Sequence, residues 1–316
     1  MGSPQHFVAS KSKDPTGLLS WWQWTCGMLL ASIFTMTYFL APLYMISALA
    51  MIYFRYPCWH AAWLFASPLL ISAIVPSISS PWMLKQLTPL LYYFEYEQIL
   101  ETSPIDGRKE MQEHGKQYIL ACQPHGVLSF TGICSAIVLN DGWRGKIPTG
   151  VATALLYTPL LKHVMGIFWL VSASKASLKR HFRKYKGDGI QGSMVLYVGG
   201  MAELFLSHPE EETLYLKNRK GFIKLALQEG VDVIPIYMFG NTSILSVLQS
   251  GWLAKLSRKY QLSLTYFWGR WGLPIPRDEK VSMFYKLVCR LSFVVDCLFL
   301  SFLFILMGVY RFSFCF

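Results

Sequence analysis

The feature that most constrains the fold is the distribution of charge over the first 84 residues. The segment Pro15–Phe54 contains no Asp, Glu, Lys or Arg, and after Arg55 the segment Tyr56–Leu84 is again free of these residues. A helix that crosses a bilayer needs roughly 20 apolar residues, so this region is long enough for two passes. We therefore predict a transmembrane helical hairpin over residues 24–84, preceded by a cytosolic segment, residues 1–23.

The composition supports lipid contact. Hydrophobic residues make up 53% of the chain and charged residues 15%, against about 25% charged residues in an ordinary soluble domain. A buried helical pair in a soluble core is the alternative. The net charge of +11 favours binding to a nucleic acid, to an anionic membrane surface or to an acidic substrate. Since the uncharged blocks are typical of membrane proteins, we expect no nucleic-acid partner.

The seven cysteines form no CxxC pair and have no regular spacing, and no Cys/His cluster is visible. This pattern argues against a disulfide framework and a zinc site, and it is consistent with chemistry on the cytosolic side of a membrane. We therefore expect no metal.

Short apolar strands alternate with helical patterns from residue 85 to residue 276. We predict strands at 117–122, 194–198 and 231–237, and helices at 127–139 and 219–229. This alternation is typical of an α/β fold with a mostly parallel sheet flanked by helices. Ligands of such sheets bind beyond the carboxyl ends of the strands, where the candidate motifs fall.

The sharpest of these motifs is Gln123-Pro124-His125-Gly126, at the junction of a strand and a helix. An imidazole titrates near neutrality, so His125 can act as a base toward an alcohol. Gly126 lets a backbone or a thioester approach closely, and its N–H is a candidate oxyanion donor. The alternative is a histidine that only hydrogen-bonds its own loop, and these four residues alone do not separate the two.

Two further groups follow strand ends or begin helices. Glu203, after Gly199 and Gly200, is placed to orient His125 or to bind a hydroxyl substrate, or else simply lies at a helix N-terminus. Arg219 and Lys220 suit the phosphates of coenzyme A, or else form a solvated basic face. A basic run indicates attraction to a membrane surface or to coenzyme A and consists of Lys175, Lys179, Arg180, Arg183, Lys184 and Lys186.

Together these motifs resemble the type-2 diacylglycerol acyltransferase family. The resemblance rests on Gln123-Pro-His-Gly126, on Val198-Gly-Gly-x-x-Glu203, on the block from Asn218 to Leu227 that continues through Gly230 into Val233–Gly240, and on Phe267–Pro276. It implies a glycerolipid-acyltransferase-like domain over residues 85–276 that transfers an acyl group from acyl-CoA to diacylglycerol, with acyl-CoA as a substrate and no cofactor. It also implies a membrane protein of the endoplasmic reticulum and lipid droplets whose catalytic domain faces the cytosol.

The resemblance assigns catalysis to His125, with Glu203 as a helper. We expect Gln123, Pro124, Gly126, Gly199, Gly200, Arg219, Lys220 and Asn241 to contact substrate. No G-x-S-x-G elbow and no activated cysteine is visible, so we expect direct transfer without an acyl-enzyme. Phe130 stands where glycerol-phosphate acyltransferases have an acid five residues after their histidine, which favours a neutral acceptor.

Two departures from the family keep alternatives open. Gln123 replaces a residue that is His in animal members and Glu in plant members. The family continues after Pro276 with a strand, a turn and a helix, whereas residues 277–316 read as an atypical apolar tail with no strand and with an apolar helix at Leu291–Tyr310. The alternatives are a monoacylglycerol or fatty-alcohol (wax ester) acyltransferase and a non-catalytic membrane relative; a homo-oligomer is also left open.

Overall fold

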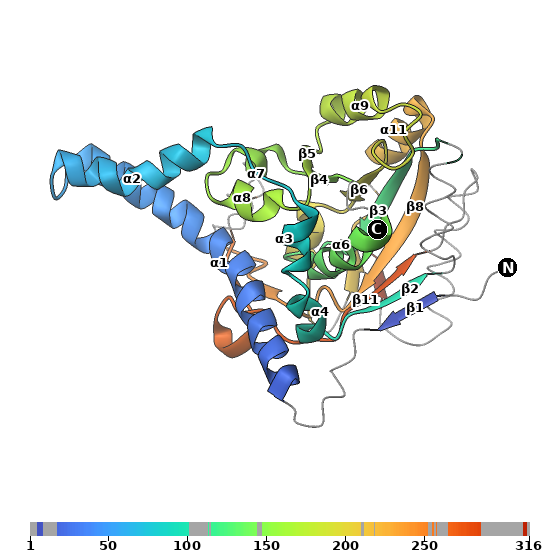
Figure 1. Ribbon diagram of the computed structural model, residues 1–316, viewed down its shortest axis with the longest axis horizontal. Coiled ribbons are helices and arrows are strands. Elements are labelled where there is room, and N and C mark those ends of the chain that lie inside the picture. The colour runs from blue at the N-terminus through green and yellow to red at the C-terminus, as the bar shows by residue number, and fades with distance from the viewer. Residues whose placement is uncertain are drawn as a thin grey trace.

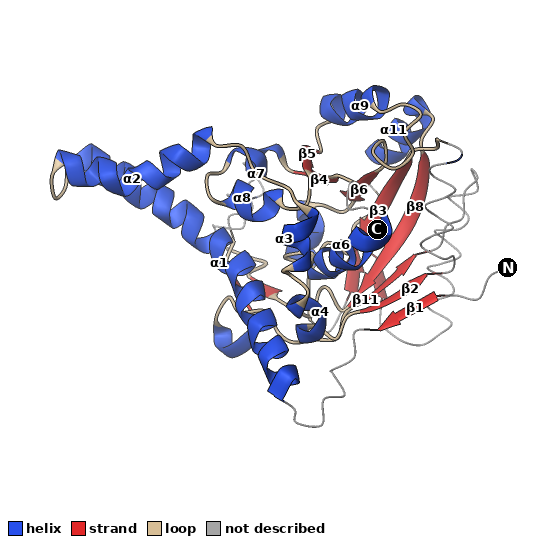
Figure 2. Ribbon diagram, viewed as in Figure 1, coloured by secondary structure: helices blue, strands red, loops and turns tan. Residues whose placement is uncertain are grey.

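The protein consists of a long helical arm joined to an α/β domain (Figures 1 and 2). The computed structural model describes residues 5–8, 18–100, 113, 115–143, 147–209, 212–217, 219–251, 255, 257, 265–285 and 312–314.

The arm is formed by helices α1, Leu18–Phe54, and α2, Trp59–Ile74, which are joined by a short turn. The Tyr44 hydroxyl donates to the Phe65 carbonyl (2.5 Å) and ties the two helices together. Among the described residues, α1 is the one helix whose length and composition would let it cross a membrane. The second helix has 16 residues and ends two residues before Pro76, so the transmembrane hairpin stays a prediction.

Helix α8, Leu161–Gly166, attaches the arm to the domain by satisfying the carboxyl end of α2. The Lys162 ammonium donates to the Ala73 carbonyl (2.9 Å), and His163 Nε2 donates to the Ser72 carbonyl (3.1 Å). The Ser72 hydroxyl in turn accepts from the Leu160 N–H (2.7 Å). The last carbonyls of a helix need such partners, so these contacts fix the direction in which α2 leaves the domain.

The domain is built on an eight-stranded sheet with the order β1-β2-β11-β8-β3-β6-β4-β5. Neighbouring strands are parallel except in the pairs β1–β2 and β8–β11. The strands are β1 Gln5–Val8, β2 Glu97–Leu100, β3 Tyr118–Gln123, β4 Thr149–Val151, β5 Leu170–Ser172, β6 Met194–Tyr197, β8 Asp232–Phe239 and β11 Ser282–Tyr285. The mostly parallel α/β sheet is therefore confirmed.

Two short strand pairs and the remaining helices complete the described structure. The pairs are β9 Ser246–Val247 with β10 Phe267–Trp268, and β7 Glu212–Leu214 with β12 Phe312–Phe314. The helices are α3 Pro81–Lys85, α4 Pro89–Tyr93, α6 Phe130–Trp143, α7 Thr153–Tyr157, α9 Lys175–Lys184, α10 Met201–Leu206 and α11 Gly221–Glu229, with a short 3₁₀ helix at Arg270–Gly272.

Alternating side chains of β3 pack into two hydrophobic cores. Leu120 and Cys122 belong to the larger core, with residues of α1, α4 and α6. Ile119 belongs to the smaller one, with residues of α9 and α11. Because successive residues of a strand point to opposite faces, helices cover both faces of the sheet, and α9 and α11 lie on the face opposite α1.

The central strands and two of the helices were predictable. The segments expected at 117–122, 194–198 and 231–237 correspond to β3, β6 and β8, and α11 lies within the helix expected at 219–229. Helix α6 overlaps the helix expected at 127–139 but begins at Phe130. The apolar helix predicted at Leu291–Tyr310 lies outside the described residues.

The expectation of no strand after residue 276 is wrong. Residues 282–285 form β11, which inserts between β2 and β8. Val281 and Met283 are almost wholly buried in the core, and Lys280 forms an ion pair with Glu97 (2.6 Å). The sequence of β11, Ser282-Met-Phe-Tyr285, shows neither a continuous apolar run nor a regular alternation of polar and apolar residues, so the strand was not recognised in sequence.

This placement of β11 predicts the effect of a cavity at Met283. We expect Met283→Ala to destabilise the protein by about 2–5 kcal/mol, because it removes buried contacts and leaves a void. The measurement is thermal unfolding of the detergent-solubilised chain, with the exposed Glu279→Ala as the control. Equal melting temperatures for the two variants would show that β11 does not belong to the core.

Candidate active site

His125 lies two residues beyond the end of β3, in the loop that leads to α6, and its side chain is half-buried. Its Nδ1 is 2.8 Å from the Gly126 carbonyl oxygen. A carbonyl oxygen can only accept, so Nδ1 carries the hydrogen and the neutral ring presents the Nε2 lone pair as its basic position. Desolvation lowers the pKa of His125, and the bond to the Gly126 carbonyl partly opposes this effect.

Asn241, in the turn that follows β8, holds this loop in place. Its Nδ2 donates to the carbonyls of Pro124 (3.2 Å) and His125 (2.7 Å). Its Oδ1 accepts from the N–H (3.2 Å) and the hydroxyl (3.1 Å) of Thr131, in the first turn of α6. The whole amide of Asn241 is therefore used inside the protein, and the residue positions the loop.

Gly126 is required by the same contact. It has a φ of +63°, and a Cβ at this position would lie 2.7 Å from Asn241 Nδ2. Any other residue would be strained in the left-handed region and would collide with the side chain that supports the loop. The glycine of the motif is thus explained by packing around His125.

Glu203 lies in the first turn of α10, and its side chain is buried. Its Oε2 accepts from the His125 N–H (2.8 Å) and its Oε1 accepts from the Tyr215 N–H (3.1 Å). The carboxylate thus holds the backbone of His125, and no bond to the imidazole is recorded. A Cβ at Gly199 would overlap the carboxyl group, so glycine there makes room for Glu203.

The pKa of the Glu203 carboxyl lies above its ordinary value, chiefly because the group is buried. Burial raises the pKa of its carboxyl, whereas the N–H groups of His125 and Tyr215 and the positive charge of Arg219 lower it. The Arg219 guanidinium also lies over the Tyr215 ring, 5.2 Å from its centroid. Arg219 Nε is buried and has no hydrogen-bond partner in the described part of the chain.

The structure brings most of the predicted residues to one edge of the sheet. Pro124 is buried, and Gln123 is half-buried with an Oε1 that has no partner among the described residues. Gly200, with a φ of +55°, begins α10 beside Gly199. Lys220 lies on the exposed start of α11, and no contact joins it to the His125 loop.

Sequence reasoning missed Tyr197, Thr131 and Tyr215. The Tyr197 ring packs edge-on against His125, with centroids 5.1 Å apart, and burial raises the pKa of its hydroxyl. A signal for Tyr197 was present, because it is the last residue of the strand that precedes Gly199. Tyr215 acts through its backbone N–H, for which no sequence signal exists.

This arrangement presents a desolvated basic nitrogen on a rigid loop, as general-base chemistry requires. The family model described as diacylglycerol acyltransferase matches residues 51–273, which is more than half of the chain. The chain belongs to the diacylglycerol acyltransferase family. The match includes every residue that builds the His125 loop.

The names of curated relatives specify different acyl acceptors. The human diacylglycerol O-acyltransferase 2-like protein 6 is 31% identical over 46% of this chain and 44% of its own length. The human acyl-CoA wax alcohol acyltransferase 2 is 30% identical over 53% of this chain and 54% of its own, and the human 2-acylglycerol O-acyltransferase 3 is 29% identical over 50% and 51%. The chain spans about half the length of the curated relatives it matches. No solved structure matches it.

The contacts of Asn241 predict the consequence of removing its amide. We expect Asn241→Ala to leave the carbonyls of Pro124 and His125 and the Thr131 N–H without a hydrogen bond. Each unsatisfied buried group should lower the free energy of unfolding by about 1–3 kcal/mol. We expect acyl-transfer activity to fall as well, because the His125 loop loses its support. Asn241→Asp keeps the shape and the acceptor for Thr131 but loses both donors. Thermal unfolding and acyl-transfer assays measure both variants. Wild-type stability and activity of Asn241→Asp would contradict a positioning role.

Proposed function

We propose that the protein is an acyl-CoA-dependent O-acyltransferase that converts diacylglycerol to triacylglycerol, with His125 as the general base. The observation that carries this proposal is the bond from Nδ1 to the Gly126 carbonyl, since it leaves Nε2 as the basic atom of the ring. Burial, which lowers the pKa of His125, keeps that nitrogen unprotonated at neutral pH. Membership of the diacylglycerol acyltransferase family supports the reaction class.

The proposed reaction is a direct transfer. His125 Nε2 takes the proton of the acceptor hydroxyl, and the oxygen attacks the carbonyl carbon of the thioester. The tetrahedral intermediate collapses as its carbon–sulfur bond breaks, and the thiolate of coenzyme A receives the proton from the imidazolium. Glu203 and Asn241 hold the loop through both steps. Their role is to keep the ring in place, which proximity catalysis requires.

The membrane assignment rests on the arm. Helix α1 is apolar along its length, and exposed side chains such as Leu43, Ile46 and Leu49 give it a lipid-compatible surface. Both the acceptor and the product would dissolve in the same bilayer. We place the enzyme in the endoplasmic reticulum membrane with its catalytic domain facing the cytosol, and at lipid droplets as a second location.

The same chemistry could act on more than one acyl acceptor. The relatives whose names specify wax alcohol and 2-acylglycerol acceptors match as well as the diacylglycerol-named one. A fatty alcohol or a monoacylglycerol is therefore the second candidate acceptor for the same chemistry.

The test is expression in cells that cannot make triacylglycerol, followed by a lipid-class profile. We expect triacylglycerol from the wild-type chain and at least roughly a 100-fold loss with His125→Ala, since the general base is removed. His60→Ala, an exposed histidine of α2, is the matched control and is expected to retain activity. Equal neutral lipid from wild type and His125→Ala would refute the proposal, and wax esters or diacylglycerol as product would reassign the acceptor. No product from wild-type protein that accumulates in membranes would favour a non-catalytic relative.

The environment of His125 also predicts a pH profile. Because desolvation lowers its pKa, the ring stays neutral and active below the ordinary histidine pKa of about 6.5. We expect kcat/KM for acyl transfer to be constant through neutral pH and to fall in acid with a midpoint below 6.5. A midpoint above that value would mean that the base is a different group or that His125 is not desolvated.

A further inference from the structure

Helix α9 carries a dense set of cations on one side. It begins after the N-cap Ser174, whose hydroxyl accepts from the Ser177 N–H (3.3 Å). Leu178 and Phe182 are its buried residues, and they pack into the smaller core against the sheet. The inward side is therefore fixed by apolar packing, which turns the basic residues outward.

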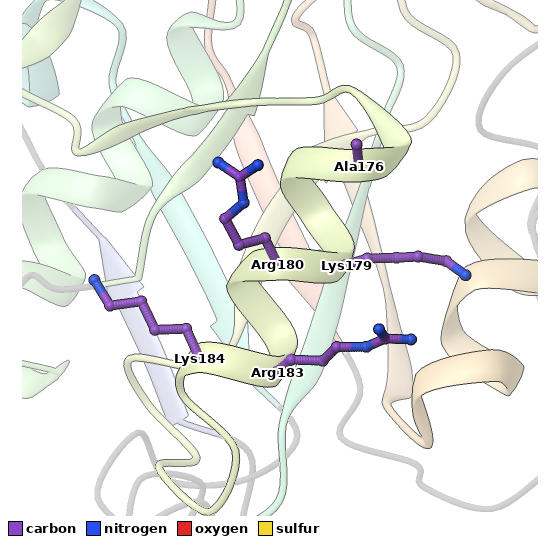
Figure 3. Close-up of a pocket in the computed structure, with 5 residues that line it drawn as sticks. All are labelled: Ala176, Lys179, Arg180, Arg183 and Lys184. Atoms are coloured by element: carbon purple, nitrogen blue, oxygen red, sulfur yellow. The ribbon is translucent and has the colours of Figure 1, made fainter.

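The outward cations lie in two rows around a hollow of about 570 Å³. Lys179 and Arg183 point toward α11, whereas Arg180 and Lys184 point the other way (Figure 3). Each pair is spaced by four residues, so its members are neighbours on the helix surface. Ala176 lines the hollow as well, and its small side chain leaves the space between the rows open.

The positive charge of the hollow is only partly compensated. Glu229, at the end of α11, accepts two hydrogen bonds from Arg183 (2.9 and 3.1 Å) and lies 3.7 Å from the Lys179 ammonium. Arg180 has no acidic partner in the described structure, and Lys184 lies over the ring of Tyr185 (5.0 Å). Like charges this close repel, so an anion with several oxygens would relieve the repulsion.

The position of α9 indicates which kind of anion it can meet. Helix α9 packs on the face of the sheet opposite α1, and Figure 1 shows it well away from α2. A bilayer that receives α1 therefore lies on the other side of the sheet. Guanidinium groups bind phosphate through two hydrogen bonds, and ammonium groups add point charge, so Arg180 and Lys184, which point to the same side of α9, suit a phosphate group (Figure 3).

We propose that this hollow is a binding site for a soluble phosphate-bearing anion, separate from the His125 site. Coenzyme A is the probe of choice because it carries a 3′-phosphate and a diphosphate and is the leaving group of the proposed reaction. The site does not depend on that reaction, since the residues that line it all belong to α9.

The test is calorimetric titration of the full chain in a nonionic detergent with coenzyme A, 3′-dephospho-coenzyme A and inorganic phosphate, together with a binding assay on vesicles that contain phosphoinositides. We expect Arg180→Ala and Lys184→Ala each to raise the Kd for coenzyme A about tenfold. Lys186→Ala is the matched control for Lys184→Ala, because Lys186 is exposed and basic but does not line the hollow. We expect its Kd to stay at the wild-type value, and all affinities to fall with added salt.

Three results would overturn the proposal. One is an equal loss with Lys186→Ala, which would mean general charge attraction. Another is an unchanged Kd in Arg180→Ala and Lys184→Ala. The third is binding only to vesicles that contain phosphoinositides, which would identify a lipid surface as the partner. Repeating the titration with His125→Ala separates this site from the catalytic one, because the inactive variant is expected to bind coenzyme A with the same dependence on Arg180.

Discussion

The structure of the site depends on one buried carboxylate. Glu203 accepts the N–H of His125 with one oxygen and the N–H of Tyr215 with the other, so two loops from different parts of the chain are fixed at a single point. Burial raises the pKa of the Glu203 carboxyl, and the two N–H donors and the charge of Arg219 oppose this effect only in part. The bonds that Glu203 accepts also hold the His125 loop, which is why the acid lies near the histidine without touching its ring.

Asn241 makes the same kind of link from the other neighbouring strand. Strand β3 lies between β6 and β8, so the residues after these strands, Glu203 and Asn241, approach the loop of His125 from its two sides. In a parallel sheet the carboxyl ends of adjacent strands lie at the same edge. Asn241 can therefore contact the His125 loop although the two residues are more than 100 positions apart. The two side chains bind the two backbone groups of His125. Glu203 accepts a hydrogen bond from its N–H, and Asn241 donates one to its carbonyl.

The parts predictable from sequence are those with a local pattern. Strands β3, β6 and β8 are continuous apolar runs, and the close backbone approach expected at Gly126 is made by Asn241. Strand β11 could not be recognised, because its four residues gain their partners from β2 and β8, which are distant in sequence. The contacts of Glu203 and Asn241 could not be predicted for a related reason: both bond to backbone groups, and sequence gives no sign of which backbone group a side chain meets.

Phe130, five residues after His125, relates this architecture to the choice of acceptor. It is fully buried, and its ring packs 4.9 Å from that of Phe94, so the start of α6 belongs to the apolar core. No acid at this position faces His125, and the imidazole is oriented by the Gly126 carbonyl instead. The nearby cation, Arg219, lies over the Tyr215 ring, and its charge lowers the pKa of the Glu203 carboxyl. A phosphorylated acceptor would have to lose its water with little compensation, whereas a neutral lipid alcohol would lose little, so the same burial that lowers the pKa of His125 also favours an uncharged acceptor.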